Sequence, residues 1–214
     1  AALINNRITK NINKNNKGGT PKMVLVYISM LFFISCAHAQ PSLNIFEDGT
    51  NKYGFKNKSG QIVIPAKYED AADFREGLAA VKQNGSWGFV DKSGKAITPF
   101  KYENTGDFNE GFAAVKLQNK WGFVNTEGKE IIPVKYEYVD DLNEGMAAVK
   151  MNNKWGFVSS AGKEVILIKY DGVNVFYKGI APVKMGNLWG FVDKTGKEVI
   201  PVKYQSWLNP PENL

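Results

Sequence analysis

Residues 77–90 read GLAAVKQNGSWGFV, and the last four letters of this stretch recur at a fixed interval. The tetrapeptide Trp-Gly-Phe-Val returns every 34 residues, beginning at Trp87, Trp121, Trp155 and Trp189. A related Tyr-Gly-Phe begins at Tyr53. A constant period of this length indicates one supersecondary unit stacked on copies of itself, so the fold depends on the structure of a single repeat.

The centre of the repeat has the pattern of a β-hairpin. Residues 77–83 and 86–90 predict two strands, and Asn84-Gly85 between them is the strongest short hairpin signal, because a type I′ turn needs positive φ at both central residues. A two-residue turn fixes the register, so Lys82 is expected opposite Trp87 and Ala80 opposite Phe89. Asp91 to Lys95, with Gly94 in a left-handed position, predicts a second turn.

A third strand is expected from Lys95 through Ile97 towards Tyr102, which makes each unit a three-stranded antiparallel meander. About eight residues, 69–76 in the first case, lead to the next unit. Helix pairs of the tetratricopeptide type share the 34-residue period. This sequence excludes them, since it has no stretch of a dozen residues with a 3.6-residue apolar period.

Alternation of side chains along the hairpin gives it two apolar faces. One face carries Ala80, Lys82, Trp87 and Phe89, and the other carries Ala79, Val81 and Val90. A sheet that is apolar on both sides must be covered on both sides, which favours stacked units that bury one another. The glycine after each tryptophan leaves room for a neighbouring backbone or ring.

The expected fold class is therefore all-β, an open superhelical array of tandem repeats, with a closed propeller-like ring as the alternative. Propeller blades have four strands and more than 40 residues, which favours the open form. The array is expected within residues 40–214, in five units: 43–76, 77–110, 111–144, 145–178 and 179–204.

The repeat resembles a known family. Trp-Gly-Phe-Val-Asp-x-x-Gly-Lys-Glu-Val-Ile-Pro-x-x-Tyr, preceded by Glu-Gly-x-Ala-x-Val-Lys, is similar to the WG repeat, also called the KWG repeat, and the match covers residues 43–204. The resemblance implies a bacterial β-rich array that is often exported and has no assigned activity. It implies no catalytic residues.

The first 39 residues read as a leader. Residues 1–22 are rich in Asn and Lys and predict a disordered or non-native upstream segment, and 23–39 match a signal peptide cleaved between Ala39 and Gln40. We expect export to the periplasm, the cell surface or the medium, with no transmembrane span after cleavage. A lipoprotein anchored through Cys36 is the alternative.

Removal of this leader changes the charge and the chemistry. The chain has 27 basic and 21 acidic residues, and five of the basic ones precede Gln40, which leaves a formal excess of about one. Nucleic-acid binding loses its support, because that contact needs uncompensated Lys and Arg. The single Cys and single His, Cys36 and His38, also lie in the leader. The mature chain thus lacks the residues for a Cys/His metal site or a catalytic triad, and no cofactor is expected.

The recurring aromatic and basic residues are the candidate binding site. They are Trp87, Trp121, Trp155 and Trp189 with Lys82, Lys116, Lys150 and Lys184 across the strand pair. The indoles are expected to be buried between units, and the lysines to form a solvated rim neutralised by Glu76, Glu110 and Glu144. Exposed indoles would instead stack on sugar rings.

We expect a non-catalytic exported scaffold that binds a protein, with cell-wall glycan as the alternative partner. A glycan hydrolase is the second alternative, since it needs only two acids, and Asp140-Asp141 and Glu69-Asp70 are the densest pairs. Acids that recur in every unit indicate turn chemistry instead. A hydrolase would need two close acids in a pocket that interrupts the repeat, and the divergent unit 145–178, in which Lys178 replaces the recurring Glu, is where such a pocket would lie.

Overall fold

The computed structural model describes residues 42–207. The predicted leader, its cleavage site between Ala39 and Gln40, Cys36 and His38 all lie outside the described residues. Among the residues described there is no helix long and apolar enough to cross a membrane.

The described chain forms five antiparallel sheets, one for each predicted repeat. The first contains β1 (Leu43–Glu47), β2 (Tyr53–Asn57) and β3 (Ile62–Tyr68). The second contains β4 (Asp70–Ala71), β5 (Leu78–Gln83) and β6 (Ser86–Asp91). The third contains β7 (Asn104–Thr105), β8 (Phe112–Leu117), β9 (Lys120–Asn125) and β10 (Glu130–Tyr136). The fourth contains β11 (Tyr138–Val139), β12 (Met146–Met151), β13 (Lys154–Ser159) and β14 (Glu164–Tyr170). The fifth contains β15 (Gly172–Val173), β16 (Ile180–Met185), β17 (Leu188–Asp193) and β18 (Glu198–Tyr204).

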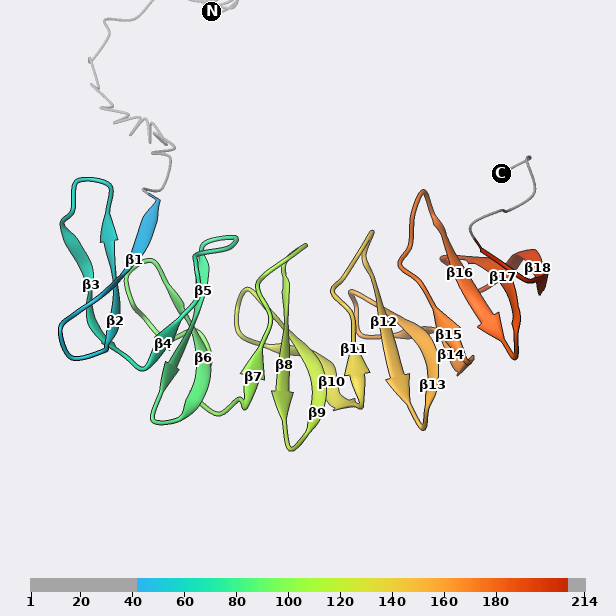
Figure 1. Cartoon of the computed structure of the whole chain (residues 1–214), viewed down its shortest axis with the longest axis horizontal. Coiled ribbons are helices and arrows are strands. Elements are labelled where there is room, and N and C mark those ends of the chain that lie inside the picture. The colour runs from blue at the N-terminus through green and yellow to red at the C-terminus, as the bar shows by residue number, and fades with distance from the viewer. Residues whose placement is uncertain (1–41, 208–214) are drawn as a thin grey trace, which may run out of the picture. The chain divides into compact units, whose positions relative to one another are not determined.

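Successive sheets follow one another in a row, with β1 to β3 at one end and β16 to β18 at the other (Figure 1). In the part of the chain that is described, no strand of the last sheet pairs with the first, so the array is open and forms no closed ring. The prediction of an all-β open array is confirmed.

The predicted hairpin register is also confirmed. Lys82 lies opposite Trp87 and Ala80 opposite Phe89 in the pair β5–β6. Asn84 and Gly85 adopt φ values of 54° and 76°, as a two-residue turn with left-handed geometry requires. The Asp91 carboxylate closes the second turn by accepting hydrogen bonds from the backbone N–H groups of Ser93 at 2.9 Å and Lys95 at 3.0 Å.

Four of the five sheets contain a short strand that the predicted meander lacks. In each of these four, the linker before the hairpin contributes a two-residue strand (β4, β7, β11 or β15) that pairs with the first long strand of that hairpin. In β11, Tyr138 lies opposite Lys150. Sequence reasoning missed these strands because two residues are too few to show an alternating pattern.

A bulge in the third strand explains the glycine that follows each tryptophan. Between the pairs Trp121–Tyr136 and Phe123–Ile132 the register shifts, which folds β10 over Gly122. A Cβ atom on Gly122 would lie 2.5 Å from the carbonyl oxygen of Ile132. Backbone at that distance leaves space only for hydrogen, so the predicted close approach is confirmed, and the approaching backbone belongs to the same repeat.

The second sheet departs from this plan, and its predicted third strand is wrong. Residues 95–102 form only isolated bridges, at Ala96 and Tyr102. Thr98 stands where the four other repeats carry Ile, and its buried hydroxyl accepts the Phe89 N–H at 2.9 Å. The Phe100 ring, instead of the backbone, lies over Gly88. Both side chains keep this segment from completing a regular ladder.

The core is divided among four seams between neighbouring sheets. Each seam joins two unlike faces, a face with a large Phe and Tyr on one sheet and a face with small Ala and Val residues on the next. The seam between the third and fourth sheets packs Ala114, Phe123, Ile132 and Tyr136 against Val139, Leu142, Ala147, Val149 and Val158. The other three seams repeat this arrangement. The expectation that stacked sheets bury each other is confirmed.

Aromatic residues of the linkers and the recurring tyrosines close these seams. Phe108 meets Phe89 edge to face with ring centroids 4.8 Å apart, and Phe176 meets Phe157 at 4.9 Å. Tyr136 is 2% exposed. Edge-to-face packing of rings in this distance range adds a favourable electrostatic contribution to the burial of their surface.

The two ends of the array are chemically different. The outer face of the first sheet carries Asn44 and Lys56 where later repeats place Ala and Val, and the Lys56 Nζ lies 5.8 Å from the Phe46 ring centre. On the last sheet the large residues Phe191 and Ile200 are buried, with only 7% and 6% of their surface exposed. A polar outer face on a terminal repeat prevents further stacking at that end.

Candidate functional site

The predicted binding residues lie together on one edge of the array. Each tryptophan is the second residue of the returning strand, so it sits beside the hairpin tip, and the tips of β5–β6, β8–β9, β12–β13 and β16–β17 lie along the same edge (Figure 1). The structure places one Trp–Lys pair on each hairpin: Trp87 with Lys82, Trp121 with Lys116, Trp155 with Lys150 and Trp189 with Lys184.

Three of these pairs have nearly the same geometry. The Nζ atoms of Lys116, Lys150 and Lys184 lie 5.8, 5.8 and 5.6 Å from the indole ring of the tryptophan opposite. These distances are within the range of cation–π attraction, which contributes about 0.5–1 kcal/mol at an exposed site. A repeated pair in a repeated geometry presents a partner with the same chemical surface on each hairpin.

The indoles were expected to be buried between units, and the structure places them there only in part. All four tryptophans are half-buried. Trp87, Trp121 and Trp155 pack against the seam clusters, and Trp189 lies beside Trp207. Trp121 packs at the border of the seam that contains Phe123. The seams are filled instead by Phe and Tyr from the same strands, because the tryptophan position lies too near the hairpin tip to be covered by the next sheet.

Carboxylates near this edge cap the hairpin turns. Glu69 accepts the Gly85 N–H at 2.8 Å, and Glu137 accepts those of Asn152 and Asn153 at 3.0 and 3.3 Å. The Asn153 and Asn152 backbone hydrogen bonds lower the pKa of Glu137. The lysine row is thus flanked by these turn acids, and the expectation that Glu76, Glu110 and Glu144 neutralise it is wrong.

Those three glutamates instead form a ladder along the opposite edge, which we call the carboxylate ladder. Each belongs to a Glu-Gly turn before a hairpin and reaches the same turn in the next repeat. Glu110 accepts the N–H groups of Glu144 at 3.0 Å and Gly145 at 2.8 Å. Glu76 accepts that of Gly111 at 2.8 Å. The ladder therefore ties neighbouring sheets together across their seams.

The last rung of the ladder is the strongest. Glu144 accepts the N–H groups of Lys178 at 2.7 Å and Gly179 at 3.0 Å, and the Lys194 Nζ lies 3.0 Å from its Oε2. The hydrogen bond from Lys194, followed by those of Gly179 and Lys178, lowers the pKa of Glu144. Two adjacent amides and one ammonium make this turn a complete carboxylate receptor.

Sequence reasoning missed these turns. Glu76 has a φ of 50° and Gly77 of 86°, so Glu-Gly occupies two left-handed positions as Asn-Gly does at the other edge. Glu is uncommon in this conformation, so its sequence gives no turn signal. The signal that would have found the turns is the recurrence of Glu-Gly in phase with the hairpins.

The acid pairs considered for hydrolysis do not form comparable sites. Glu69 and Asp70 each accept a nearby backbone N–H, from Gly85 and Ala71. Asp141 lies near Asp140 and Asp107, and partial desolvation followed by the charges of these two neighbours raises its pKa. No group of three possible metal ligands is found in residues 42–207.

A comparison with known protein families finds the same five-fold repeat. The profile of the family described as WG containing repeat matches residues 53–87, 87–121, 121–155, 155–189 and 189–213. A search among curated proteins finds no match.

Several solved structures show distant similarity. KlHsv2 with loop 6CD replaced by a Gly-Ser linker is 12% identical, with a TM-score of 0.44 over 74% of this chain and 61% of that chain. The WD40 beta propeller domain of Doa1 is 9% identical, with a TM-score of 0.35 over 74% and 64%. The AfRom2 CNH domain is 11% identical, with a TM-score of 0.27 over 78% and 86%. The chain spans less than two thirds of the length of the first two of these proteins.

Proposed function

The chain belongs to the family of WG-containing repeats, and on that premise we propose that it is a non-catalytic, exported scaffold that binds a protein partner along its hairpin-tip edge. The observation that carries the proposal is the recurrence of half-buried Trp–Lys pairs with Nζ-to-ring distances of 5.6 to 5.8 Å.

Repetition makes such a surface effective. One exposed Trp–Lys pair contributes little on its own, but an extended partner that contacts several pairs makes each later contact intramolecular, which raises the overall affinity without new chemistry. Tryptophan is also among the residues enriched at the energetically important positions of protein interfaces. The open array leaves the hairpin tips of successive repeats on one edge, where such a partner can reach them (Figure 1).

The indole environments favour protein over sugar. Each of three indoles already has a lysine ammonium over its ring, and Tyr138 meets Trp155 edge to face at 5.6 Å. A sugar ring that stacks on an indole needs an uncovered ring face, whereas a protein surface can contact the ring edge and the lysine together. Cell-wall glycan is the second candidate, because the indoles are only partly buried.

The experiment is a quantitative pull-down from cell-envelope extract with three forms of the chain. The test form replaces Lys116, Lys150 and Lys184 by Gln, and the control form replaces Lys95, Lys129 and Lys163, which follow the second turn on the opposite edge, by Gln. Both lose the same charge. We expect the parent and the control to recover the same protein, and the test form to lose it. Equal recovery by all three forms, or recovery of polysaccharide without protein, would contradict the proposal.

A further inference from the structure

The fifth sheet shows how this fold binds a carboxylate. The Lys178-Gly179 turn has φ values of 52° and 83°, and its two N–H groups, at 2.7 and 3.0 Å, point at the Glu144 carboxylate. Lys194, from the turn after the same hairpin, adds an ammonium at 3.0 Å. Successive amides in this conformation form a concave site for an anion, and the ammonium makes the contact charge-assisted.

The same three groups occur at the start of the array. Glu76 and Gly77, three repeats earlier than Lys178 and Gly179, form a turn with φ values of 50° and 86°. Lys92 is three repeats earlier than Lys194, whereas the two sheets between carry Thr126 and Ser160 at that position. The backbone conformation and the cation of the last rung are thus both repeated here.

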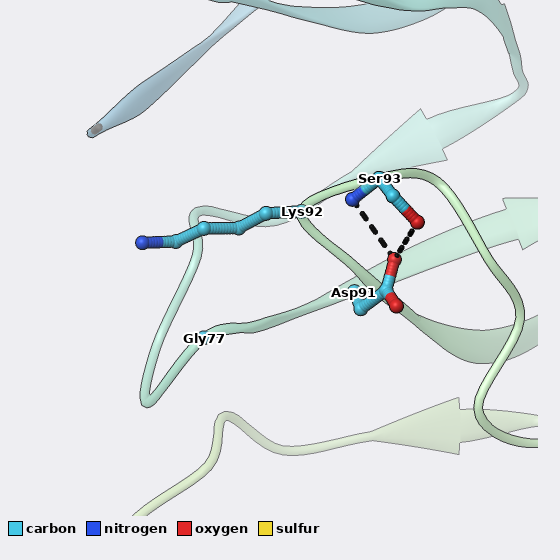
Figure 2. Close-up of a pocket in the computed structure, with 4 residues that line it drawn as sticks. All are labelled: Gly77, Asp91, Lys92 and Ser93. Carbon is cyan, nitrogen blue, oxygen red and sulfur yellow. Dashed lines mark hydrogen bonds between the residues drawn. The ribbon is translucent and has the colours of Figure 1, made fainter. Parts of the chain in front are cut away.

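A pocket of about 320 Å³ lies at this place, lined by Gly77, Asp91, Lys92 and Ser93. Figure 2 shows the Lys92 side chain extending away from the Asp91 turn, on the side where Gly77 lies. The Asp91 carboxylate is already held within its own turn, where it accepts the N–H and hydroxyl of Ser93 at 2.9 and 2.6 Å. The Lys92 ammonium therefore has no carboxylate within ion-pair distance among the described residues.

No carboxylate of residues 42–207 reaches the Glu76-Gly77 turn. In the other seams the acid comes from the residue one repeat before the turn. The register of β1 with β2 aligns Leu43 with Leu78, so the sequence position that corresponds to Glu76 is Pro41, which carries no acid. The Glu76 carboxylate itself points to the next repeat, where it accepts the Gly111 N–H. The guanidinium of Arg75, beside the turn, lies 4.0 Å from Asp107 and adds positive charge nearby.

We propose that the Glu76-Gly77 turn and Lys92 form a binding site for the carboxylate of an acidic peptide segment of a partner protein. The site lies on the opposite edge from the Trp–Lys pairs, so it goes beyond the function proposed above and stands or falls separately. At the three equivalent turns of the later repeats, the bound group is a glutamate side chain. This favours an acidic peptide over other anions as the ligand of the Glu76-Gly77 turn.

A second copy of the chain does not fit this site. The acid that would continue the ladder from the last repeat of another copy is replaced by Lys178, which would place a cation against Lys92. The outer face of the first sheet, with Asn44 and Lys56, also lacks the small apolar residues that accept the large face of another sheet. The ligand is therefore a different, acidic molecule.

The test is a titration of the isotope-labelled full chain, followed by NMR at the backbone N–H groups of the Glu-Gly turns. The probe is acetylated hexaglutamate amide, with the hexaglutamine peptide as the uncharged control and an oligogalacturonate as a carboxylate-bearing glycan. The variants are Lys92→Met and its matched control Lys58→Met from the first repeat.

We expect saturable shifts of the Glu76 and Gly77 N–H signals with hexaglutamate and none at Gly145 or Gly179, whose turns already hold a carboxylate. Lys92→Met should weaken binding by about threefold or more, since an exposed ion pair is lost, while Lys58→Met leaves it unchanged. The proposal is wrong if Gly77 does not respond, if both lysine variants bind as the parent does, or if oligogalacturonate binds more tightly than the peptide.

Discussion

Gly122 illustrates how single residues fix this fold. The bulge of β10 places the Ile132 carbonyl oxygen and the Val134 nitrogen 2.5 and 2.7 Å from the position of a Cβ atom at Gly122, and both belong to backbone that cannot move without breaking the strand pair. The recurrence of glycine after tryptophan was enough to predict a close approach. It was not enough to identify the approaching group, because a bulge leaves no alternating pattern in the sequence.

A matched pair of substitutions tests this residue-scale constraint. Gly122→Ala should lower the free energy of unfolding by at least about 2 kcal/mol, because the methyl group forces the backbone of β10 away. Gly88→Ala meets the Phe100 ring at 2.8 Å, and this side chain can shift, so a cost of about 1 kcal/mol is expected. Urea unfolding of both variants measures the difference. A larger loss of unfolding free energy for Gly88→Ala than for Gly122→Ala would show that backbone crowding does not explain why glycine follows each tryptophan.

Lys82 and Trp87 show how far the site was predictable at this scale. Their pairing across the strands followed from the two-residue turn and is confirmed. The half-burial of the indoles was not predicted, since it depends on where the next sheet ends and not on the strand that carries the ring. Whether these residues bind a partner stays a prediction.

At the scale of the element, the turns carry more than connectivity. Asn-Gly and Asp-x-x-Gly turns have well-known sequence signals and were predicted, whereas the Glu-Gly turns and the two-residue strands were missed. The second sheet shows the opposite limit: its third segment has the pattern of a strand, yet Thr98 binds the Phe89 N–H and prevents a regular ladder. A side-chain hydrogen bond of this kind depends on tertiary placement.

The carboxylate ladder predicts an acid-dependent part of the stability. The pKa of Glu144 is lowered by Lys194 and by the Gly179 and Lys178 amides, so the folded state binds its proton less readily than the unfolded state does. Its contribution is complete above the ordinary value of 4.5 and is lost as the pH falls from there through the lowered folded pKa. Glu144→Gln should therefore be less stable than the parent at pH 7, and this difference should disappear in strong acid.

Glu127→Gln is the control for charge, because the Glu127 side chain accepts no hydrogen bond across a seam in the described residues. Thermal unfolding of the two variants and the parent between pH 2 and pH 7 measures the effect. If Glu127→Gln and Glu144→Gln have the same pH dependence, the ladder does not stabilise the array.

At the scale of the whole array, unlike faces decide how sheets assemble. Large rings on one face meet Ala and Val on the next, so every seam is heterologous, and such contacts continue indefinitely unless an end is blocked. Asn44 and Lys56 block the first sheet. The 34-residue period and the two apolar faces of each sheet predicted that the sheets stack. The prediction of an open array over a closed ring rested only on the repeat being shorter than a propeller blade.

Removing this block should produce head-to-tail association. The double variant Asn44→Ala and Lys56→Val restores on the first sheet the residues that other sheets present to their neighbours. We expect species larger than those of the parent at the same concentration, growing as the concentration rises, when measured by sedimentation velocity. Substituting Lys58, which lies on the turn beyond this face, by Val should have no such effect, and equal association of both variants would contradict the capping role.

A double-mutant cycle across a seam tests the stacking most directly. Phe123 of the third sheet and Val149 of the fourth lie in one buried cluster, whereas Phe55 belongs to the seam between the first two sheets. For Phe123→Leu combined with Val149→Ala we expect a coupling free energy of about 0.5 kcal/mol or more, and for Phe55→Leu with Val149→Ala, additivity within about 0.3–0.5 kcal/mol. Additive effects in the first pair would contradict sheets that bury one another.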